Sequence, residues 1–386
     1  MTQTVLLGDI LYPVSDTMKF TDKKVIFLNT SDIEAGKFLH ANLLDTTTLP
    51  GQAKKKIQQD DILFSEIRPV NKRFAYVNFV DTSRYVVSTK LMVLRSRDIV
   101  YPKYAYYWLT APQQLSQLQV IAESRSGTFP QITFDTVKNL KVTLPDHSDQ
   151  IKIAEFIDEI DEKIELNRRM NETLEQMGQA LFRHYFIDNP EAEKWENVKI
   201  GELLNIKGGG TPSTKNPDFW NGSVAWTSPR DLTGKNDAYI LTTDKTITDI
   251  GLAKVSSGLL PKETLLLSSR APIGYVAIAG LPLAINQGYI AFLPGAYLSN
   301  HFMYFWLKHN MDRIKNAANG STFMEISKSA FRSITTLKPG EELLRDFEIE
   351  AENLFDAMRN NQEQTQTLTT LRDTLLPSLI SGKVKI

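Results

Sequence analysis

Three short stretches of the sequence hold residues that could act in catalysis, and none has the complete pattern that such a site requires. Asn216–Phe219 resembles the Asn/Asp-Pro-Pro-aromatic motif that holds a flipped base in DNA methyltransferases, but its second proline is missing. Gly208–Gly210 lacks the Gly-Lys-Ser/Thr ending of a phosphate-binding loop, so a flexible turn or a close approach to a DNA backbone fits it better. Asp161–Lys163 matches part of a nuclease motif, but its place in a helical stretch predicts a solvated run of charges.

The histidines do not have the spacing of metal ligands. They are His40, His147, His184, His301 and His309. His301 and His309 lie eight residues apart in a predicted helix, and the chain has no cysteine that could supply a thiolate. The sequence therefore predicts neither a catalytic residue nor a metal site.

The remaining candidate functional residues are suited to binding DNA rather than to catalysis. In the first part of the chain they are Lys54, Lys55, Lys56, Arg68, Lys72, Arg73, Lys90 and Arg125. In the second part they are Lys207, Gly209, Thr211, Ser213, Lys215, Arg230, Arg270, Asn286 and Gln287, of which the first five belong to a glycine-rich basic loop that we expect to be mobile. Arginine can read guanine with two hydrogen bonds, asparagine and glutamine can read adenine, and lysine more often holds phosphates. Each is equally compatible with an ordinary surface position that binds nothing.

A long helix in the middle of the chain is the first element that could position these residues. Between Ile151 and Ile187, apolar residues recur in alternating steps of four and three. The positions are Ile153, Ile157, Ile160, Ile164, Leu174, Leu181 and Tyr185, with Asn167, Asn171 and Gly178 in the gaps. This spacing is typical of a coiled-coil seam. A helix of this length, about 50 Å at 1.5 Å per residue, needs a partner.

The same series returns 194 residues later and supplies that partner. It reads Phe347, Ala351, Leu354, Met358, Leu368, Leu375 and Leu379, with Asn361, Thr365 and Arg372 in the gaps. Asn167 thus corresponds to Asn361. A polar residue on a seam costs stability but fixes register, so both residues are candidates for setting the register of antiparallel helices.

The correspondence extends beyond the helices. Val5–Leu11 corresponds to Val198–Leu204, and Tyr104–Leu109 to Phe302–Leu307. The runs at 126–129 and 320–323 are also similar. Any two amphipathic helices can be aligned in this way, but a match over the whole length indicates a tandem duplication. It predicts a first globular domain at 1–145, a long helix at 146–188, a linker and second domain at 189–339, and a second long helix with a tail at 340–386.

Both globular parts read as compact α+β domains, with strands in runs rather than in a regular βαβ alternation. The predicted elements of the first domain are strands at 62–67, 74–80 and 85–94 and a helix at 102–119. Those of the second are strands at 264–268, 275–279 and 288–293 and a helix at 299–318. We expect Trp220 and Trp226 to belong to a core.

The two globular segments are basic and the two helical segments are acidic. Residues 1–145 and 199–339 have five and six more basic than acidic side chains, whereas 146–186 and 340–386 have five and four more acidic ones. Basic domains favour a phosphate backbone and acidic helices favour a protein partner. Small basic domains and acidic helices are also common without such partners.

The composition also limits the cellular location. Residues 1–20 have no basic start followed by an apolar core, so we expect no N-terminal signal. The most apolar region, 264–298, is interrupted by Arg270, prolines and glycines, which predicts buried strands and no membrane span. The lack of cysteine is compatible with the cytoplasm, where we expect the protein to lie.

Two further blocks complete a pattern found in a known family. The second domain opens with Gly-Gly-Gly-Thr-Pro-Ser at 208–213, then Phe-Trp-Asn-Gly at 219–222 and Trp226, and the chain ends Leu-Leu-Pro-Ser-Leu-Ile-Ser-Gly at 375–382. With the duplication and the paired long helices, the chain resembles the specificity subunit of type I restriction–modification enzymes over nearly its whole length. The first domain departs from the pattern, because Tyr12–Asp16 stands where the glycine loop would lie.

The resemblance implies a division of labour. Each globular domain would be a target-recognition domain for one half of a split, asymmetric site in double-stranded DNA. The two helices would pair antiparallel and act as a spacer between the two domains. A pseudo-twofold axis would relate one domain to the other. Two adenine methyltransferase subunits would dock on the helices, and restriction subunits would join them. S-adenosylmethionine, ATP and Mg²⁺ would bind to those partners, with no cofactor in this chain.

Two other interpretations remain open at this point. The chain could be a coiled-coil structural adaptor whose globular ends hold protein ligands, which predicts no salt-dependent DNA binding. It could also be the recognition half of a single-chain restriction enzyme that has lost its catalytic part. Only the first interpretation predicts a complex of one chain with two methyltransferase subunits.

Overall fold

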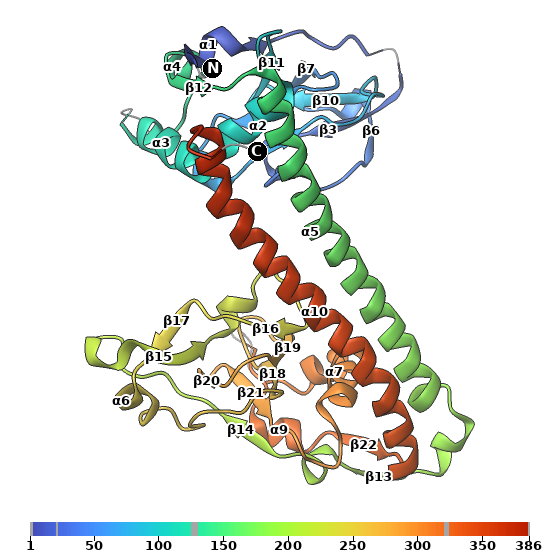
Figure 1. Cartoon of the computed structure of the whole chain (residues 1–386). Coiled ribbons are helices and arrows are strands. Elements are labelled where there is room, and N and C mark those ends of the chain that lie inside the picture. Colours follow the sequence, from blue (N-terminus) through green and yellow to red (C-terminus); the bar gives the residue numbers. More distant parts are fainter. Residues whose placement is uncertain (1–2, 21, 125–129, 320–323, 385–386) are drawn as a thin grey trace. The chain divides into compact units, whose positions relative to one another are not determined.

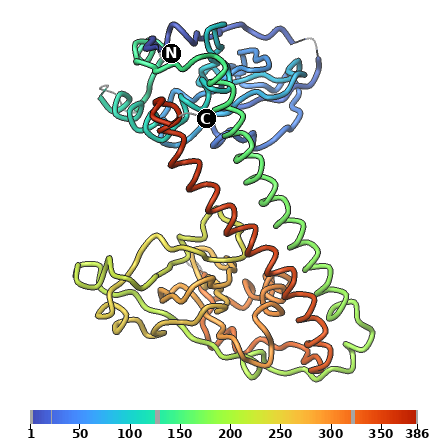
Figure 2. The backbone as a smooth tube through the Cα atoms, viewed as in Figure 1, coloured from blue at the N-terminus to red at the C-terminus, as the bar shows by residue number. Residues whose placement is uncertain are grey.

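The chain folds into two compact units, each of which combines a globular domain with parts of two long helices (Figure 1). The computed structural model describes residues 3–20, 22–124, 130–319 and 324–384. Unit 1 comprises residues 1–163 and 367–386, and unit 2 comprises residues 164–366. Arg125 and the similar runs at 126–129 and 320–323 lie outside the described residues. Figure 2 traces the first long helix in green and the second in red.

Unit 1 contains two four-stranded sheets. The central sheet has the order β2-β11-β8-β9 and is antiparallel throughout. The second sheet has the order β6-β3-β10-β7, in which β3 and β10 are parallel. The strands are β2 (Leu11–Val14), β3 (Lys24–Leu28), β6 (Leu43–Asp45), β7 (Ala53–Lys56), β8 (Ile62–Ser65), β9 (Phe74–Tyr76), β10 (Tyr85–Ser88) and β11 (Leu91–Ser96). Leu63, Val87 and Val93 are fully buried in the core that both sheets share.

Short strands and helices complete this domain. They are β1 (Gln3–Leu6), which pairs with β12 (Lys141–Leu144), β4 (Ile33–Glu34), which pairs with β5 (Lys37–Phe38), α1 (Leu7–Ile10), α2 (Pro102–Thr110), α3 (Pro112–Glu123) and α4 (Phe134–Val137). The single helix predicted at 102–119 is wrong, because Ala111 is extended and Pro112 has no amide proton to continue the ladder. The strand predicted at 85–94 is likewise two strands, separated by a turn at Thr89 and Lys90.

Unit 2 repeats this plan. Its central sheet has the order β14-β21-β18-β19-β16, and its second sheet has the order β17-β15-β20. The strands are β13 (Glu196–Lys199), β14 (Ile206–Gly208), β15 (Trp220–Thr227), β16 (Tyr239–Ile240), β17 (Lys245–Ile247), β18 (Leu265–Ser268), β19 (Val276–Ala279), β20 (Leu283–Ile285), β21 (Tyr289–Phe292) and β22 (Thr335–Lys338). The short helices are α6 (Asp249–Leu252), α7 (Asn300–His309), α8 (Met311–Asn316) and α9 (Lys328–Arg332).

The strand orders confirm the duplication that the sequence predicts. Strands β2-β11-β8-β9 of unit 1 correspond to β14-β21-β18-β19 of unit 2, with the same antiparallel pairings. The parallel pair β3–β10 corresponds to the parallel pair β15–β20, and β1–β12 to β13–β22. Strand β7, which carries Lys54–Lys56, pairs antiparallel with β10. In unit 2 the equivalent pairing with β20 is reduced to one bridge between Leu260 and Leu283. The fold is α+β with an internal repeat.

The two long helices are α5 (His147–Phe182), extended by a π-helical turn at Arg183–Ile187, and α10 (Glu341–Ile380). Every residue of both predicted seams is buried or half-buried. In unit 2 the helices pair antiparallel, because Asn171 contacts Met358 whereas Tyr185, further along α5, contacts Glu350. In unit 1 the first part of α5 contacts the last part of α10 through Asp161 and Arg372.

The environment of Asp161 differs from the prediction. Its carboxylate is half-buried, accepts a hydrogen bond from Arg372 Nη1 at 2.6 Å and lies 3.3 Å from the Tyr107 hydroxyl. The expectation of a solvated charge run is therefore wrong for this residue. A charged side chain can occupy a helix interface when an opposite charge from the partner helix compensates its burial, and single-sequence periodicity cannot show that partner.

The predictions for the apolar region 264–298 and for the two tryptophans agree with the fold. The apolar region 264–298 forms β18 to β21, and none of the described helices is long and apolar enough to cross a membrane. Trp226 is buried and Trp220 is half-buried against it, with ring centroids 5.2 Å apart. Among the described residues, no three acidic or histidine side chains are grouped so that they could hold a metal ion.

Candidate nucleic-acid interface

The turn between β20 and β21 organises the polar residues of the second domain. Asn286 Oδ1 accepts a hydrogen bond from Gly288 N at 2.7 Å, which closes the turn. Gln287 is exposed, and its Oε1 accepts a hydrogen bond from Thr211 Oγ1 at 2.5 Å. The sequence-predicted residues Thr211, Asn286 and Gln287 are thus brought together at one end of the sheets.

The glycine-rich loop beside this turn is fastened to the domain. Gly210 N donates to Ile285 O at 2.9 Å, and Trp226 Nε1 donates to Gly210 O at 3.2 Å. A Cβ atom on Gly209 would lie 2.0 Å from Ile285 O, so only glycine allows this close approach. Backbone and side-chain groups from distant parts of the sequence therefore bind the backbone of this loop, and its expected mobility stays a prediction.

Cationic side chains surround the turn. Arg230 is exposed and follows Pro229, whose Cγ would lie 3.2 Å from a Cβ atom on Gly288. Arg270 is half-exposed and forms an ion pair with Glu325 at 3.5 Å. Of the other predicted residues, Ser213 and Lys215 are exposed, whereas Lys207 Nζ approaches Ser257 O at 3.4 Å.

Lys328, at the start of α9, is a cation that the sequence analysis missed. Its Nζ lies over Gly208, where an added Cβ atom would approach it to 2.6 Å. The segment that leads to it runs beside the turn, because Ile326 N donates to Ser269 O and Ser269 N donates to Gly288 O. An isolated lysine between two serines gives no signal in the sequence. We call Thr211, Arg230, Arg270, Asn286, Gln287 and Lys328 the second recognition surface.

The first domain has an equivalent turn between β10 and β11. Ser88 Oγ accepts a hydrogen bond from Lys90 N at 3.2 Å, as Asn286 Oδ1 does from Gly288 N. Glu66 N donates to Lys90 O at 3.2 Å, which repeats the bond from Ser269 N to Gly288 O. The two turns therefore occupy the same place in the two repeats.

The basic residues of the first domain differ in solvent exposure. Lys90 and Arg68 are exposed at the turn and at the loop that follows Glu66, and we call them the first recognition surface. Lys55 Nζ donates to Leu91 O at 2.7 Å and to Thr89 O at 3.2 Å, beneath the turn. Burial lowers the pKa of the Lys55 ammonium, while the charge of Glu66 raises it less.

The remaining candidates of this domain lie elsewhere. Lys54 and Lys56 are exposed and alternate with Lys55 along β7, so they point to the opposite face of that strand. Lys72 is exposed, with a left-handed backbone at φ 55°. Arg73 is turned inward, since its Nη1 donates to Ile33 O at 3.2 Å and lies 3.6 Å from Glu34.

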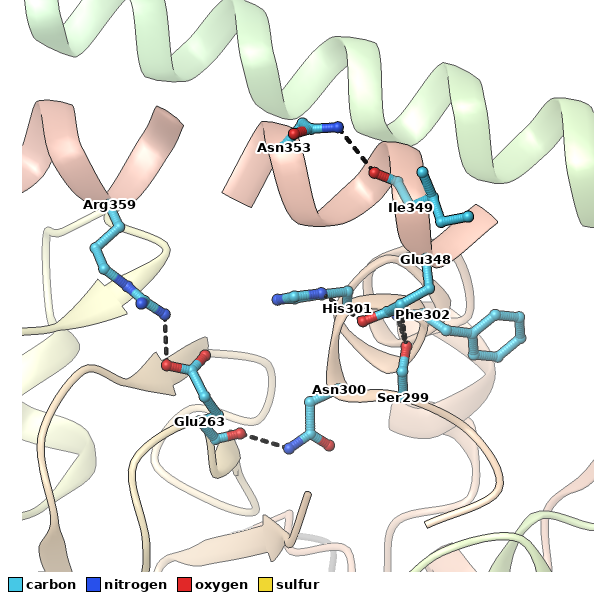
Figure 3. A network of polar contacts seen from close by, with 9 residues as sticks. All are labelled: Glu263, Ser299, Asn300, His301, Phe302, Glu348, Ile349, Asn353 and Arg359. Atoms are coloured by element: carbon cyan, nitrogen blue, oxygen red, sulfur yellow. Dashed lines mark hydrogen bonds and ion pairs between the residues drawn. The ribbon is translucent and has the colours of Figure 1, made fainter. Parts of the chain in front are cut away.

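Helix α10 contacts the second domain through the side chains of Arg359 and Glu348 (Figure 3). Arg359 pairs with Glu263, which precedes β18, whereas Ser269 and Arg270 follow β18. Glu348 accepts hydrogen bonds from Ser299 Oγ and from His301 Nδ1, the latter at 2.8 Å. Burial raises the pKa of the Glu348 carboxyl, but His301 and Ser299 outweigh burial and hold that pKa below its ordinary value.

A family match and two similar proteins all point to the specificity subunits of type I restriction enzymes. The family described as the type I restriction modification DNA specificity domain matches residues 3–176 and 192–336. The HindI specificity subunit of a type I restriction enzyme from Haemophilus influenzae is 32% identical, over 98% of both chains. The MjaIX specificity subunit from Methanocaldococcus jannaschii is 33% identical, over 45% of this chain and 41% of that one.

A solved structure shows the same fold. The type I restriction–modification S subunit from M. genitalium has a TM-score of 0.60 and 17% sequence identity. The similarity covers 98% of this chain and 96% of that one.

Proposed function

The chain belongs to the type I restriction–modification DNA specificity family as a non-catalytic specificity subunit, and from this premise we propose that its two domains read the two halves of a bipartite, asymmetric DNA site. The first and second recognition surfaces, around the β10–β11 and β20–β21 turns, are the parts of each domain that would meet the duplex.

The observation that carries this proposal is the equivalence of the two turns combined with their different side chains. Each turn is held by an equivalent backbone–backbone bond and by an equivalent bond from a backbone amide to a side-chain oxygen. Lys90 stands where the second turn has Gly288, and Arg68 follows its strand where the second domain has Ala271. Equivalent positions with different donors suit two readers that face different base sequences.

The long helices are the proposed docking surface for two adenine methyltransferase subunits. In unit 2, α5 carries a second apolar stripe away from the seam, formed by Leu166, Met170 and Met177, which are 44%, 41% and 53% exposed. These residues follow helical spacing on one face. An exposed apolar stripe on an acidic helix favours a partner protein over a DNA phosphate backbone.

The catalytic chemistry is assigned to partners by the same proposal. The methyltransferase subunits would bind S-adenosylmethionine and flip the adenine, and restriction subunits would bind ATP and Mg²⁺. The assembly would act in the cytoplasm. This chain would contribute DNA contacts and spacing, and no cofactor.

Co-expression with the methyltransferase subunit tests the proposal. We expect one copy of this chain to purify with two methyltransferase subunits, and the complex to methylate adenines in one bipartite site. The variant Met170→Glu with Met177→Glu should lose the methyltransferase subunits, whereas Gln176→Glu, exposed on the same helix, should keep them. A chain that binds protein ligands but shows no salt-dependent DNA affinity would instead support the adaptor interpretation.

A further inference from the structure

The two amides of the β20–β21 turn are oriented by bonds within the protein. The oxygen of Gln287 accepts from Thr211, and the oxygen of Asn286 accepts from Gly288 N. Neither Asn286 Nδ2 nor Gln287 Nε2 has a hydrogen-bond partner among the residues that the structure describes. Bonds within the protein therefore engage both amide oxygens and leave two NH₂ groups as donors.

This orientation distinguishes two kinds of DNA contact. To read adenine with two hydrogen bonds, an amide must donate to N7 and accept from N6, so its oxygen must also face the base. A phosphate oxygen only accepts, and it is satisfied by amide NH₂ groups and by lysine. Amides whose oxygens already accept bonds within the protein, and whose NH₂ groups remain as donors, match a phosphate better than the two-bond adenine contact.

Lys328 adds a positive charge to the same place. Glycine at position 208 leaves room for its Nζ, and the described residues include no ion-pair partner for it. It differs in this respect from Arg270, which is paired with Glu325 at 3.5 Å. Lys328 and the two amides belong to segments that successive backbone bonds join through Ser269 and Gly288.

We propose that Asn286, Gln287 and Lys328 form a sequence-independent site for a DNA backbone phosphate in the second domain, and that Thr211 positions Gln287 for it. This inference rests on the proposed DNA-binding function. In this proposal the three residues fix the position of the domain along the duplex. Other side chains of the second recognition surface then read the bases.

The test uses the full chain in its methyltransferase complex. Binding is measured against salt concentration for a duplex of random sequence and for the methylated site, and the methylated motif is mapped in a host genome. Lys328→Gln should weaken both duplexes alike, by roughly threefold to tenfold, and lower the salt slope by about one, with an unchanged motif. Gln287→Lys should tighten binding to both duplexes and also leave the motif unchanged.

The controls separate the possible failures. Lys262→Gln removes an exposed lysine from the opposite end of β18 and should leave affinity unchanged. A motif that relaxes at one base in Gln287→Lys, with no gain on random DNA, would overturn the phosphate site while supporting DNA reading. Wild-type complex without any salt-dependent affinity would instead refute the proposed function itself. Melting temperatures of all variants identify any loss of folding.

Discussion

Asn167 Nδ2 donates to the backbone oxygen of Asn361 at 3.3 Å, so the two seam asparagines of the duplicated helices meet across the antiparallel interface. Asn167 also donates to Gln364 Oε1 at 2.8 Å, and Asn361 Nδ2 donates to Asn171 Oδ1 at 2.9 Å. Asn171 in turn donates to Met358 O at 3.0 Å. A slip by one helical turn would break all four bonds, and apolar contacts alone would not resist such a slip.

Replacing Asn167 with leucine should keep the helices paired and relax their register. The amide is fully buried, and its Oδ1 has no partner among the described residues, so leucine removes an uncompensated polar atom. We expect an equal or higher melting temperature. We also expect methylation of bipartite sites whose spacer differs by a base pair from the preferred one.

Asn353→Leu is the matched control, because Asn353 is exposed on α10 and, among the described residues, donates only to Ile349 of its own helix. It should leave the preferred spacer unchanged. If Asn167→Leu also shows an unchanged spacer preference, the two seam asparagines do not set the register.

Gly178→Ala should destabilise unit 2, although alanine favours helices. A Cβ atom at this position would lie 2.1 Å from Phe305 Cζ, inside a packed aromatic cluster. The overlap should cost about 1–3 kcal/mol, more than the gain in helix propensity of about 1 kcal/mol. Thermal unfolding measures the difference, and Gly51→Ala, with nothing within 4 Å, should show no such loss.

The parts of this architecture that repeat along the chain could be predicted from the sequence. The seams follow from spacing alone, because each helix fixes the direction of its own side chains. The similarity of Tyr104–Leu109 to Phe302–Leu307 likewise predicted equivalent helices, α2 and α7. What the sequence could not show is which residues compensate each other across the interface.

The position of Arg372 on the second seam illustrates this limit. In unit 1, Arg372 pairs with Asp161, which also accepts from Tyr107. The equivalent residues of unit 2 are Gly178, Phe355 and Phe305, which pack without charge. All three positions differ between the two repeats because the three residues are in contact in each unit. They are far apart in sequence, so the sequence alone does not show that they are related.

The candidate site was predictable only in part for the same reason. Residue type identified Lys55 and Arg73 as basic but could not show that backbone carbonyls hold both. Lys328 was missed because its neighbours, Gly208 and the turn at Asn286, come from other segments. The serine and asparagine that close the two equivalent turns differ in type, so an alignment of residues does not relate them.

Lys90 and Lys55 should therefore respond differently to substitution. Lys90→Gln should lower the affinity of the complex for DNA and reduce the salt slope by about one, because an exposed cation at the turn is lost. Lys55→Met should lower thermal stability, because two carbonyls beneath the turn lose their donor, and should leave the salt slope unchanged. Equal changes in salt slope would contradict the division between inner and outer lysines.

The contact between Glu348 and His301 predicts how the stability of unit 2 depends on pH. The folded state holds the pKa of Glu348 below its ordinary value of 4.5, so the unfolded state binds more protons in the acid range. The stabilisation is therefore complete above pH 4.5 and is lost as the pH falls through the lower, folded-state pKa. Chemical denaturation of the wild type and of Glu348→Gln measures it, with a difference in unfolding free energy that is largest near pH 6 and shrinks towards pH 3. Glu352→Gln, at an exposed position one helical turn away, should show no such pH-dependent difference. A constant difference between the wild type and Glu348→Gln from pH 6 to pH 3 would mean that the carboxylate charge does not contribute to holding α10 on this domain.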